Sequence, residues 1–136
     1  MAELAHRISP GTFVTATLDG AAVLCLKVER EARDYVNHYL VPVEPCADPA
    51  SLALVYIDPE DGFETVEGVR LAVGEPRSGE AGIGEVVAAG EGRYLKVLDD
   101  PRSQKLFCFV DLATGLVRPR PKRGETAVAG WTVVRS

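Results

Sequence analysis

The chain has 136 residues, 46% of them hydrophobic and 26% charged, a balance that supports a buried core beneath a charged surface. This composition excludes a mostly disordered chain, and no apolar run reaches the length of about 18 residues that a membrane-spanning helix requires. A net charge of −5 argues against a protein that acts mainly on nucleic acid, because phosphate contacts need clustered lysine and arginine. Three cysteines and the absence of a basic-then-apolar leader predict a cytoplasmic protein without a disulfide framework.

Strand patterns begin after a segment over 1–10 that we expect to be flexible. The segment 12–18 alternates apolar and polar residues, which is typical of a half-buried strand. The dipeptide Asp19-Gly20 follows at once and suits the positive φ angles of a two-residue hairpin turn. We therefore expect 21–29 to return as the antiparallel partner strand.

Prolines mark boundaries in the next part of the chain. A third strand is expected over 35–43, with Pro42 confining that end to a sheet edge, because proline cannot donate a hydrogen bond to a ladder. Asp48-Pro49 suits the start of a helix, as N-cap and first helical residue. The run 52–57 nevertheless favours a strand, because it is short and ends in β-branched and aromatic residues. The sequence leaves strand and helix both open for 49–57.

The rest of the chain has the pattern of short strands between turns. These strands are expected at 63–66, 69–73, 83–89, 93–98, 105–112, 116–119 and 128–134. The segment 74–82 holds three glycines, a proline and one apolar residue, and we expect it to be a mobile loop. Trp131 should be at least half buried and anchor the last strand, with Val133 on the same face by alternation.

An internal repeat is suggested at an offset of 69 residues. Leu26-Lys27-Val28 aligns with Leu95-Lys96-Val97, and a few further identities follow at the same offset. The pattern fits two similar β-meander halves joined by the glycine-rich segment. Chance identities among common strand residues explain it equally well.

Together the strands and turns predict a single all-β domain over 1–136, either a small barrel or a two-sheet sandwich of mainly antiparallel strands. The runs 52–57 and 106–110 are apolar on both faces. We expect the second face of such strands to be covered by a barrel wrap, by a long loop or by another subunit.

Cys25, His38 and Cys108 are the candidate ligand-binding residues. Each of the two cysteines sits between large apolar residues, where a free cysteine usually acts as a small buried apolar side chain. His38 shares a predicted strand face with Val36 and Leu40, so a half-buried imidazole and a general base are both compatible with its position. The cysteines and histidines lack the spacing of a zinc site, and the chain has no Gly-x-Ser-x-Gly or His-Glu-x-x-His motif. We therefore expect no metal, no cofactor and no catalytic residue.

Two segments of opposite charge are candidate interaction sites. From Glu44 to Glu67 the chain has no lysine or arginine, and Asp58 and Asp61 are among its acidic residues. The basic cluster consists of Arg118, Arg120, Lys122 and Arg123. Solvated loops would explain both segments, and head-to-tail association or a charged partner is the functional interpretation.

These observations favour a non-catalytic binding or assembly module that acts through a sheet face, an edge strand or its loops. The expected partner is the chain itself, as a homo-oligomer, or another protein, with no membrane. A nucleic acid that binds the basic cluster is the third and least favoured interpretation. The alternative is a small enzyme or ligand-binding β-barrel with a pocket near His38 and cysteine residues.

Overall fold

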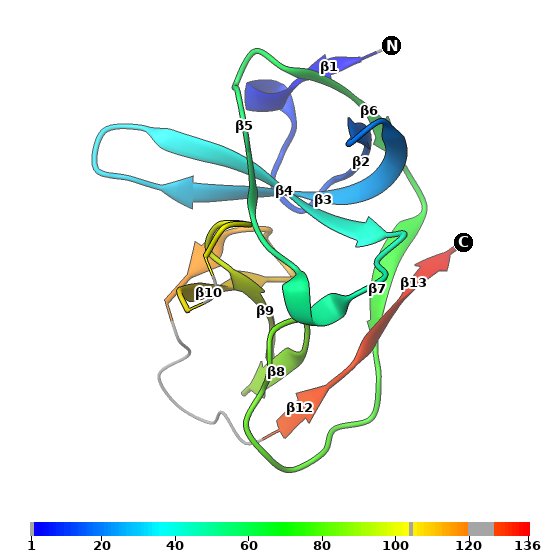
Figure 1. Cartoon of the computed structure of the whole chain (residues 1–136), viewed down its shortest axis with the longest axis vertical. Coiled ribbons are helices and arrows are strands. Elements are labelled where there is room, and N and C mark those ends of the chain that lie inside the picture. Colours follow the sequence, from blue (N-terminus) through cyan, green and yellow to red (C-terminus); the bar gives the residue numbers. More distant parts are fainter. Residues whose placement is uncertain (1, 104, 120–126) are drawn as a thin grey trace.

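The computed structural model describes residues 2–103, 105–119 and 127–136 (Figure 1). Over these residues the protein is all-β, as predicted, and its sheets are built from antiparallel pairs. Two principal sheets pack as a sandwich, and the described strands do not close into a single barrel. No helix in this part of the chain is long and apolar enough to cross a membrane.

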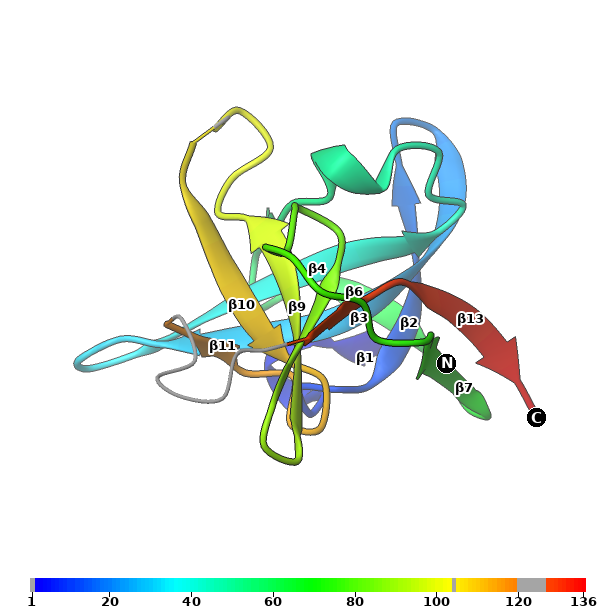
Figure 2. The same cartoon turned by 90° about the horizontal axis from the view of Figure 1, so that it is seen from below.

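The larger sheet has six strands in the order β1-β6-β2-β3-β4-β5, and its centre is the meander β2-β3-β4. Its strands are β1 (Glu3–Leu4), β2 (Phe13–Leu18), β3 (Ala21–Glu31), β4 (Val36–Glu44), β5 (Val55–Ile57) and β6 (Gly62–Val66). The β3–β4 hairpin is the longest element, and it projects from the body of the molecule in both views (Figures 1 and 2). Two single-turn 3-10 helices, η1 (Ala5–Arg7) and η2 (Pro49–Ser51), connect parts of this sheet.

The second sheet has five strands in the order β11-β10-β9-β8-β12, and its centre is the meander β8-β9-β10. Its strands are β8 (Val86–Ala89), β9 (Gly92–Leu98), β10 (Phe107–Asp111), β11 (Val117–Arg118) and β12 (Ala127–Ala129). The strands β7 (Val69–Val73) and β13 (Trp131–Arg135) form a separate antiparallel ribbon. The expected last strand is therefore two strands, β12 and β13, which belong to different sheets.

The first hairpin forms as its turn sequence predicts. Leu18 pairs with Ala21, which leaves Asp19 and Gly20 as a two-residue turn. Both have positive φ angles, 50° and 80°, as a type I′ turn requires. The second strand is longer than expected, because β3 continues to Glu31 before the chain reverses into β4.

The proline signals resolve into compatible local structures. The Asp48 side chain accepts a hydrogen bond from the Ala50 amide and caps η2, with Pro49 as its first residue. The strand β5 follows, so the capping signal and the strand signal in 49–57 are both correct over adjacent short stretches. β5 pairs with β4 only from His38 to Leu40, so Pro42 lies beyond that ladder, as its missing N–H requires.

Three apolar clusters account for the strands that are apolar on both faces. The largest lies between the two sheets and includes Val28, Leu95 and Val110, with Trp131 and Val133 packed against it from the ribbon, as predicted. Two smaller clusters cover the outer faces of the sheets. The chain itself supplies these covers, through Ala5 and Ile8 on one sheet and Ala81 on the other.

The two meanders share one register, which supports the internal repeat. Lys27 pairs with Leu40 across β3 and β4, and Lys96 pairs with Phe109 across β9 and β10. These two pairs differ by the repeat offset of 69 residues. The first strands pair in the same way, Phe13 with Leu26 and Val86 with Leu95, but they are 73 residues apart, because the β8–β9 hairpin is shorter by two residues in each strand.

In each half, the segment that follows the third strand of the meander pairs with the middle strand of the other half. Leu116, which follows β10, forms a parallel bridge with Glu29 on β3. Ala53, which follows β4, forms a parallel bridge with Leu98 on β9. Glu29 and Leu98 are equivalent positions of the repeat. Each half therefore contacts the same strand of the other half, and the two halves are related by approximate two-fold symmetry.

Candidate interaction surface

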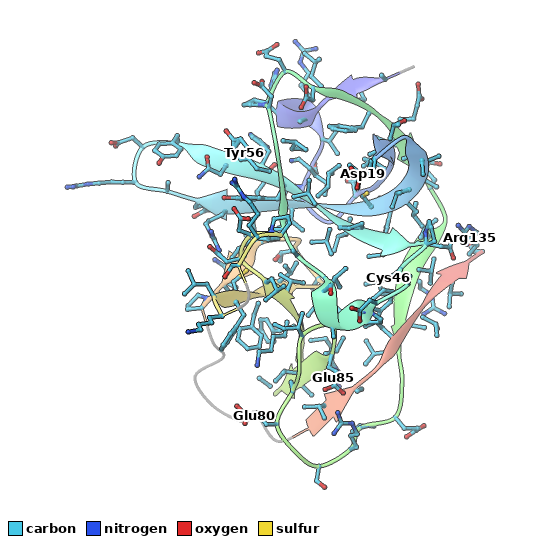
Figure 3. All side chains as sticks on the ribbon, in the orientation of Figure 1. Asp19, Cys46, Tyr56, Glu80, Glu85 and Arg135 are labelled. Atoms are coloured by element: carbon cyan, nitrogen blue, oxygen red, sulfur yellow. The ribbon has the colours of Figure 1, made fainter. Side chains whose placement is uncertain are left out.

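Large apolar side chains remain exposed on the projecting β3–β4 hairpin, on the adjacent strand β5, and at the start of β10. Among the described residues, the exposed large hydrophobic side chains are Tyr35, Val36, Tyr56, Leu106 and Phe107. Tyr56 on β5 is 61% exposed, and Leu106, just before β10, is 67% exposed. Figure 3 shows Tyr56 above the projecting hairpin and Arg135 on the opposite side of the molecule.

A chain of contacts connects two of these exposed residues, Tyr56 and Leu106. The Tyr56 and Tyr39 rings meet edge to face, with centroids 5.8 Å apart. The Arg30 guanidinium lies 5.7 Å from the centroid of the Tyr39 ring and forms an ion pair with Asp99. The Asp99 amide donates to the Leu106 carbonyl oxygen at 2.9 Å. We call this set of five residues, Tyr39, Tyr56, Arg30, Asp99 and Leu106, the aromatic surface.

The repeat explains why the two sheets meet at this point. Arg30 and Asp99 occupy equivalent positions of the two halves, 69 residues apart, and they pair with each other. In a two-fold arrangement, a residue meets its own counterpart only near the axis. The ion pair therefore marks the approximate axis, and the aromatic surface surrounds it.

Cys108 lies at the inner side of this surface. Its position corresponds to that of Tyr39 in the other half, and its side chain is buried between the sheets. Burial raises the pKa of the Cys108 thiol to about 12, so the thiolate is scarce at neutral pH. Cys108 acts here as a small apolar side chain, as its neighbours Phe107 and Phe109 indicated.

The other two candidate ligand-binding residues lie elsewhere. Cys25 and His38 belong to the outer face of the six-stranded sheet, whereas Cys108 belongs to the cluster between the sheets. Cys25 is fully buried, and burial raises the pKa of its thiol to about 12. The structure thus does not bring Cys25, His38 and Cys108 together around one pocket.

His38 instead faces a buried ion pair that the sequence analysis did not single out. Lys27 is completely buried, and its Nζ donates to Glu29 Oε2 at 2.8 Å and to the Ile8 carbonyl oxygen at 3.1 Å. His38 Nδ1 lies 3.6 Å from the same Glu29 oxygen and has no hydrogen-bond partner in the structure. The sequence signal that could have identified Lys27 is the repeat, because a lysine recurs between two apolar residues at Lys27 and at Lys96.

Two hollows on the surface of the described residues do not include Cys25, His38 or Cys108. One of about 550 Å³ is lined by Cys46, Pro49 and Trp131, among others, between η2 and β13. Another of about 490 Å³ lies along β2, β5 and β6 and includes Tyr56 and Asp61. Within the described ranges, no three His, Cys, Asp or Glu side chains gather in a way that could hold a metal ion.

The charged candidate residues are only partly described. Asp58 and Asp61 lie in the exposed turn before β6, where each side chain accepts a hydrogen bond from a backbone amide of the turn. Arg118 is exposed at the end of β11. The remaining residues of the basic cluster, Arg120, Lys122 and Arg123, lie outside the described residues.

Comparison with known proteins does not assign the chain to a family. No known family model, curated protein or solved structure matches it.

Proposed function

We propose that the chain is a non-catalytic binding module that assembles through the aromatic surface, most simply as a homodimer. The observation that supports this proposal is the contact chain of the aromatic surface, which connects two exposed apolar side chains, those of Tyr56 and Leu106, through Tyr39 and the ion pair. Soluble proteins rarely leave grouped aromatic and aliphatic side chains in water unless another surface covers them. Tyrosine and arginine, which this surface combines, are enriched among the residues that dominate binding energies.

The rigidity of this surface favours binding. Arg30 and Asp99 are about one-third exposed and already neutralise each other, so a partner would not bury an unpaired charge there. The edge-to-face contact between Tyr39 and Tyr56 limits the motion of both rings. A partner therefore meets side chains that are largely pre-ordered, which lowers the entropic cost of association.

A second copy of the chain is the simplest partner. An apolar surface that contains both members of an ion pair is self-complementary across a two-fold axis. The acidic stretch from Glu44 to Glu67 and the basic cluster that begins at Arg118 have opposite charges and would add an attraction that salt screens. Another protein with an apolar patch is the second possibility for the partner.

The alternative function, a ligand pocket near His38 and the cysteines, has less support. Cys25 and Cys108 lie in separate clusters, and burial disfavours the reactive form of both thiols. His38 lies against the inaccessible Lys27 ammonium rather than at the floor of either large hollow.

Sedimentation of matched surface variants at micromolar concentration tests the proposal. Tyr56→Gln and Leu106→Gln each remove exposed apolar area from the aromatic surface. Thr132→Gln is the control, because Thr132 is exposed on β13, away from the projecting hairpin (Figure 2). We expect the two surface variants to weaken dimerisation about tenfold or more, corresponding to about 1.4 kcal/mol each, and the control to leave it unchanged. Dimers of equal affinity in all three variants would contradict the proposed surface.

A further inference from the structure

The segment before β2 covers one face of the six-stranded sheet. Ala5 and Ile8 are buried in the outer cluster of that sheet, at 0% and 4% exposure. The Ala5 amide donates to the Asp61 carbonyl oxygen, and the Gly11 amide donates to the Lys27 carbonyl oxygen at 2.8 Å. Residues 5–12, between β1 and β2, are thus a cover that is held by backbone hydrogen bonds, by the packing of Ala5 and Ile8 and by one buried polar side chain.

That side chain is Lys27, and its buried positive charge depends on the negative charge of a single carboxylate. Its ammonium holds the cover through the Ile8 carbonyl oxygen and is neutralised by Glu29. His38 Nδ1 lies close to the same carboxylate oxygen, at 3.6 Å, but forms no hydrogen bond in the structure. With a neutral imidazole the buried group contains one positive and one negative charge.

The second half of the chain provides an internal comparison. Lys96 is equivalent to Lys27, and its Nζ donates to the Ala81 carbonyl oxygen at 2.8 Å, on the segment that covers the other sheet. The positions that correspond to Glu29 and His38 are occupied by Leu98 and Phe107. The Lys96 ammonium lies 4.1 Å from the centroid of the Phe107 ring, and its charge contributes to the lowered pKa of Glu85 rather than acting on a histidine. A lysine thus bonds a carbonyl oxygen of the covering segment in both halves, and only the first half has a histidine beside this lysine.

We infer that Lys27, Glu29 and His38 form an acid-sensitive latch, in which protonation of His38 releases residues 5–12 from the outer face of the sheet. A protonated imidazole would compete with Lys27 for the single Glu29 carboxylate and leave an excess positive charge in a buried place. Such a charge is costly without water. Release of the cover relieves this cost, because water then reaches the Lys27 ammonium and the imidazolium.

The surrounding charges give the direction of the response. On β3, Lys27 faces His38 with a positive charge and Glu29 with a negative charge, and from η1 His6 adds a positive influence when protonated. His6 is itself 4.0 Å from Glu60. Burial, followed by the charge of Lys27, lowers the pKa of His38 below its usual value, and Glu29 opposes this shift. The open form, with an ordinary histidine, therefore binds the proton better, so acid favours release.

Amide hydrogen exchange of the full chain between pH 7.5 and about 5.5, a range in which an ordinary histidine titrates, tests the latch. The Gly11 amide reports on the first cover, and the equivalent Gly84 amide, bonded to the Lys96 carbonyl oxygen at 2.8 Å, is the internal control. After correction for intrinsic exchange rates, we expect protection at Gly11 to fall severalfold in acid while protection at Gly84 stays constant.

Two substitutions at position 38 and one at position 6 complete the test. His38→Phe copies the residue of the second half, and His38→Gln is a smaller polar change in case the phenylalanine variant does not fold. Both should keep Gly11 protected in acid, whereas His6→Gln should behave like the wild type. Equal protection of wild-type Gly11 at both pH values would overturn the inference. So would an acid response that persists in the His38 variants.

Discussion

Replacement of Lys27 by methionine should be among the most destabilising single changes in this protein. Methionine retains the apolar stem but removes the ammonium, which leaves the Ile8 carbonyl oxygen without its donor and the Glu29 carboxylate without its cation. Breaking a buried ion pair by removing one partner costs about 3–5 kcal/mol. The Glu29 side chain is 17% exposed and partly hydrated, so we expect a loss near the lower end, about 3 kcal/mol.

The equivalent lysine provides a matched comparison. Lys96→Met removes one hydrogen bond to the Ala81 carbonyl oxygen and one cation–π contact with Phe107. The Glu85 carboxylate, whose pKa the Lys96 charge helps to lower, keeps its ion pair with Arg77 and is not left without a cation. The expected loss is about 1–2 kcal/mol. Adding Glu29→Leu to Lys27→Met, which copies the leucine at position 98, should recover most of the larger loss.

Urea unfolding followed by the fluorescence of Trp131, the single tryptophan of the chain, measures these differences. The indole N–H donates to the Gly84 carbonyl oxygen at 2.8 Å, so unfolding will change its surroundings. Equal losses in the Lys27 and Lys96 variants would refute the argument that the uncompensated carboxylate dominates the cost. The same holds for a double variant that is no more stable than Lys27→Met alone.

Three further predictions concern backbone geometry and thiols. Gly20→Val should lower stability by about 1 kcal/mol or more in thermal unfolding, because φ at this turn is +80° while the space around it is open. Gly84→Ala should be more damaging, since a Cβ there would overlap the backbone of η2 as well as require a positive φ; a melting temperature no lower than that of Gly20→Val would count against this view. A thiol reagent at neutral pH should modify Cys46 first in the native chain and reach the buried Cys25 and Cys108 only on unfolding, and rapid labelling of three equivalents would disagree with their burial.

The sequence predicted local structure best where one signal acts alone. The Asp19-Gly20 turn and the alternation around Trp131 are short-range patterns, and both appear as expected. The segment 49–57 carried two signals, and the structure satisfies each of them over a few residues. The division of the last strand at Gly130 was not visible, because it depends on which sheet each half of that segment meets.

The candidate surface and the latch needed the tertiary structure. Tyr56 and Leu106 are far apart in the sequence and are connected only through the ion pair between Arg30 and Asp99. Lys27 resembled an ordinary polar interruption of an apolar strand. Its complete burial became apparent only when the cover segment and Glu29 were in place.

The native mass of the wild-type chain tests the central claim most directly. Light scattering at micromolar concentration, in low and in moderate salt, should give twice the 14.6-kDa mass of one chain. The dimer should persist in moderate salt with somewhat lower affinity, because apolar contacts dominate and the charged segments contribute a screened attraction. A mass of one chain under both conditions would contradict assembly through the aromatic surface.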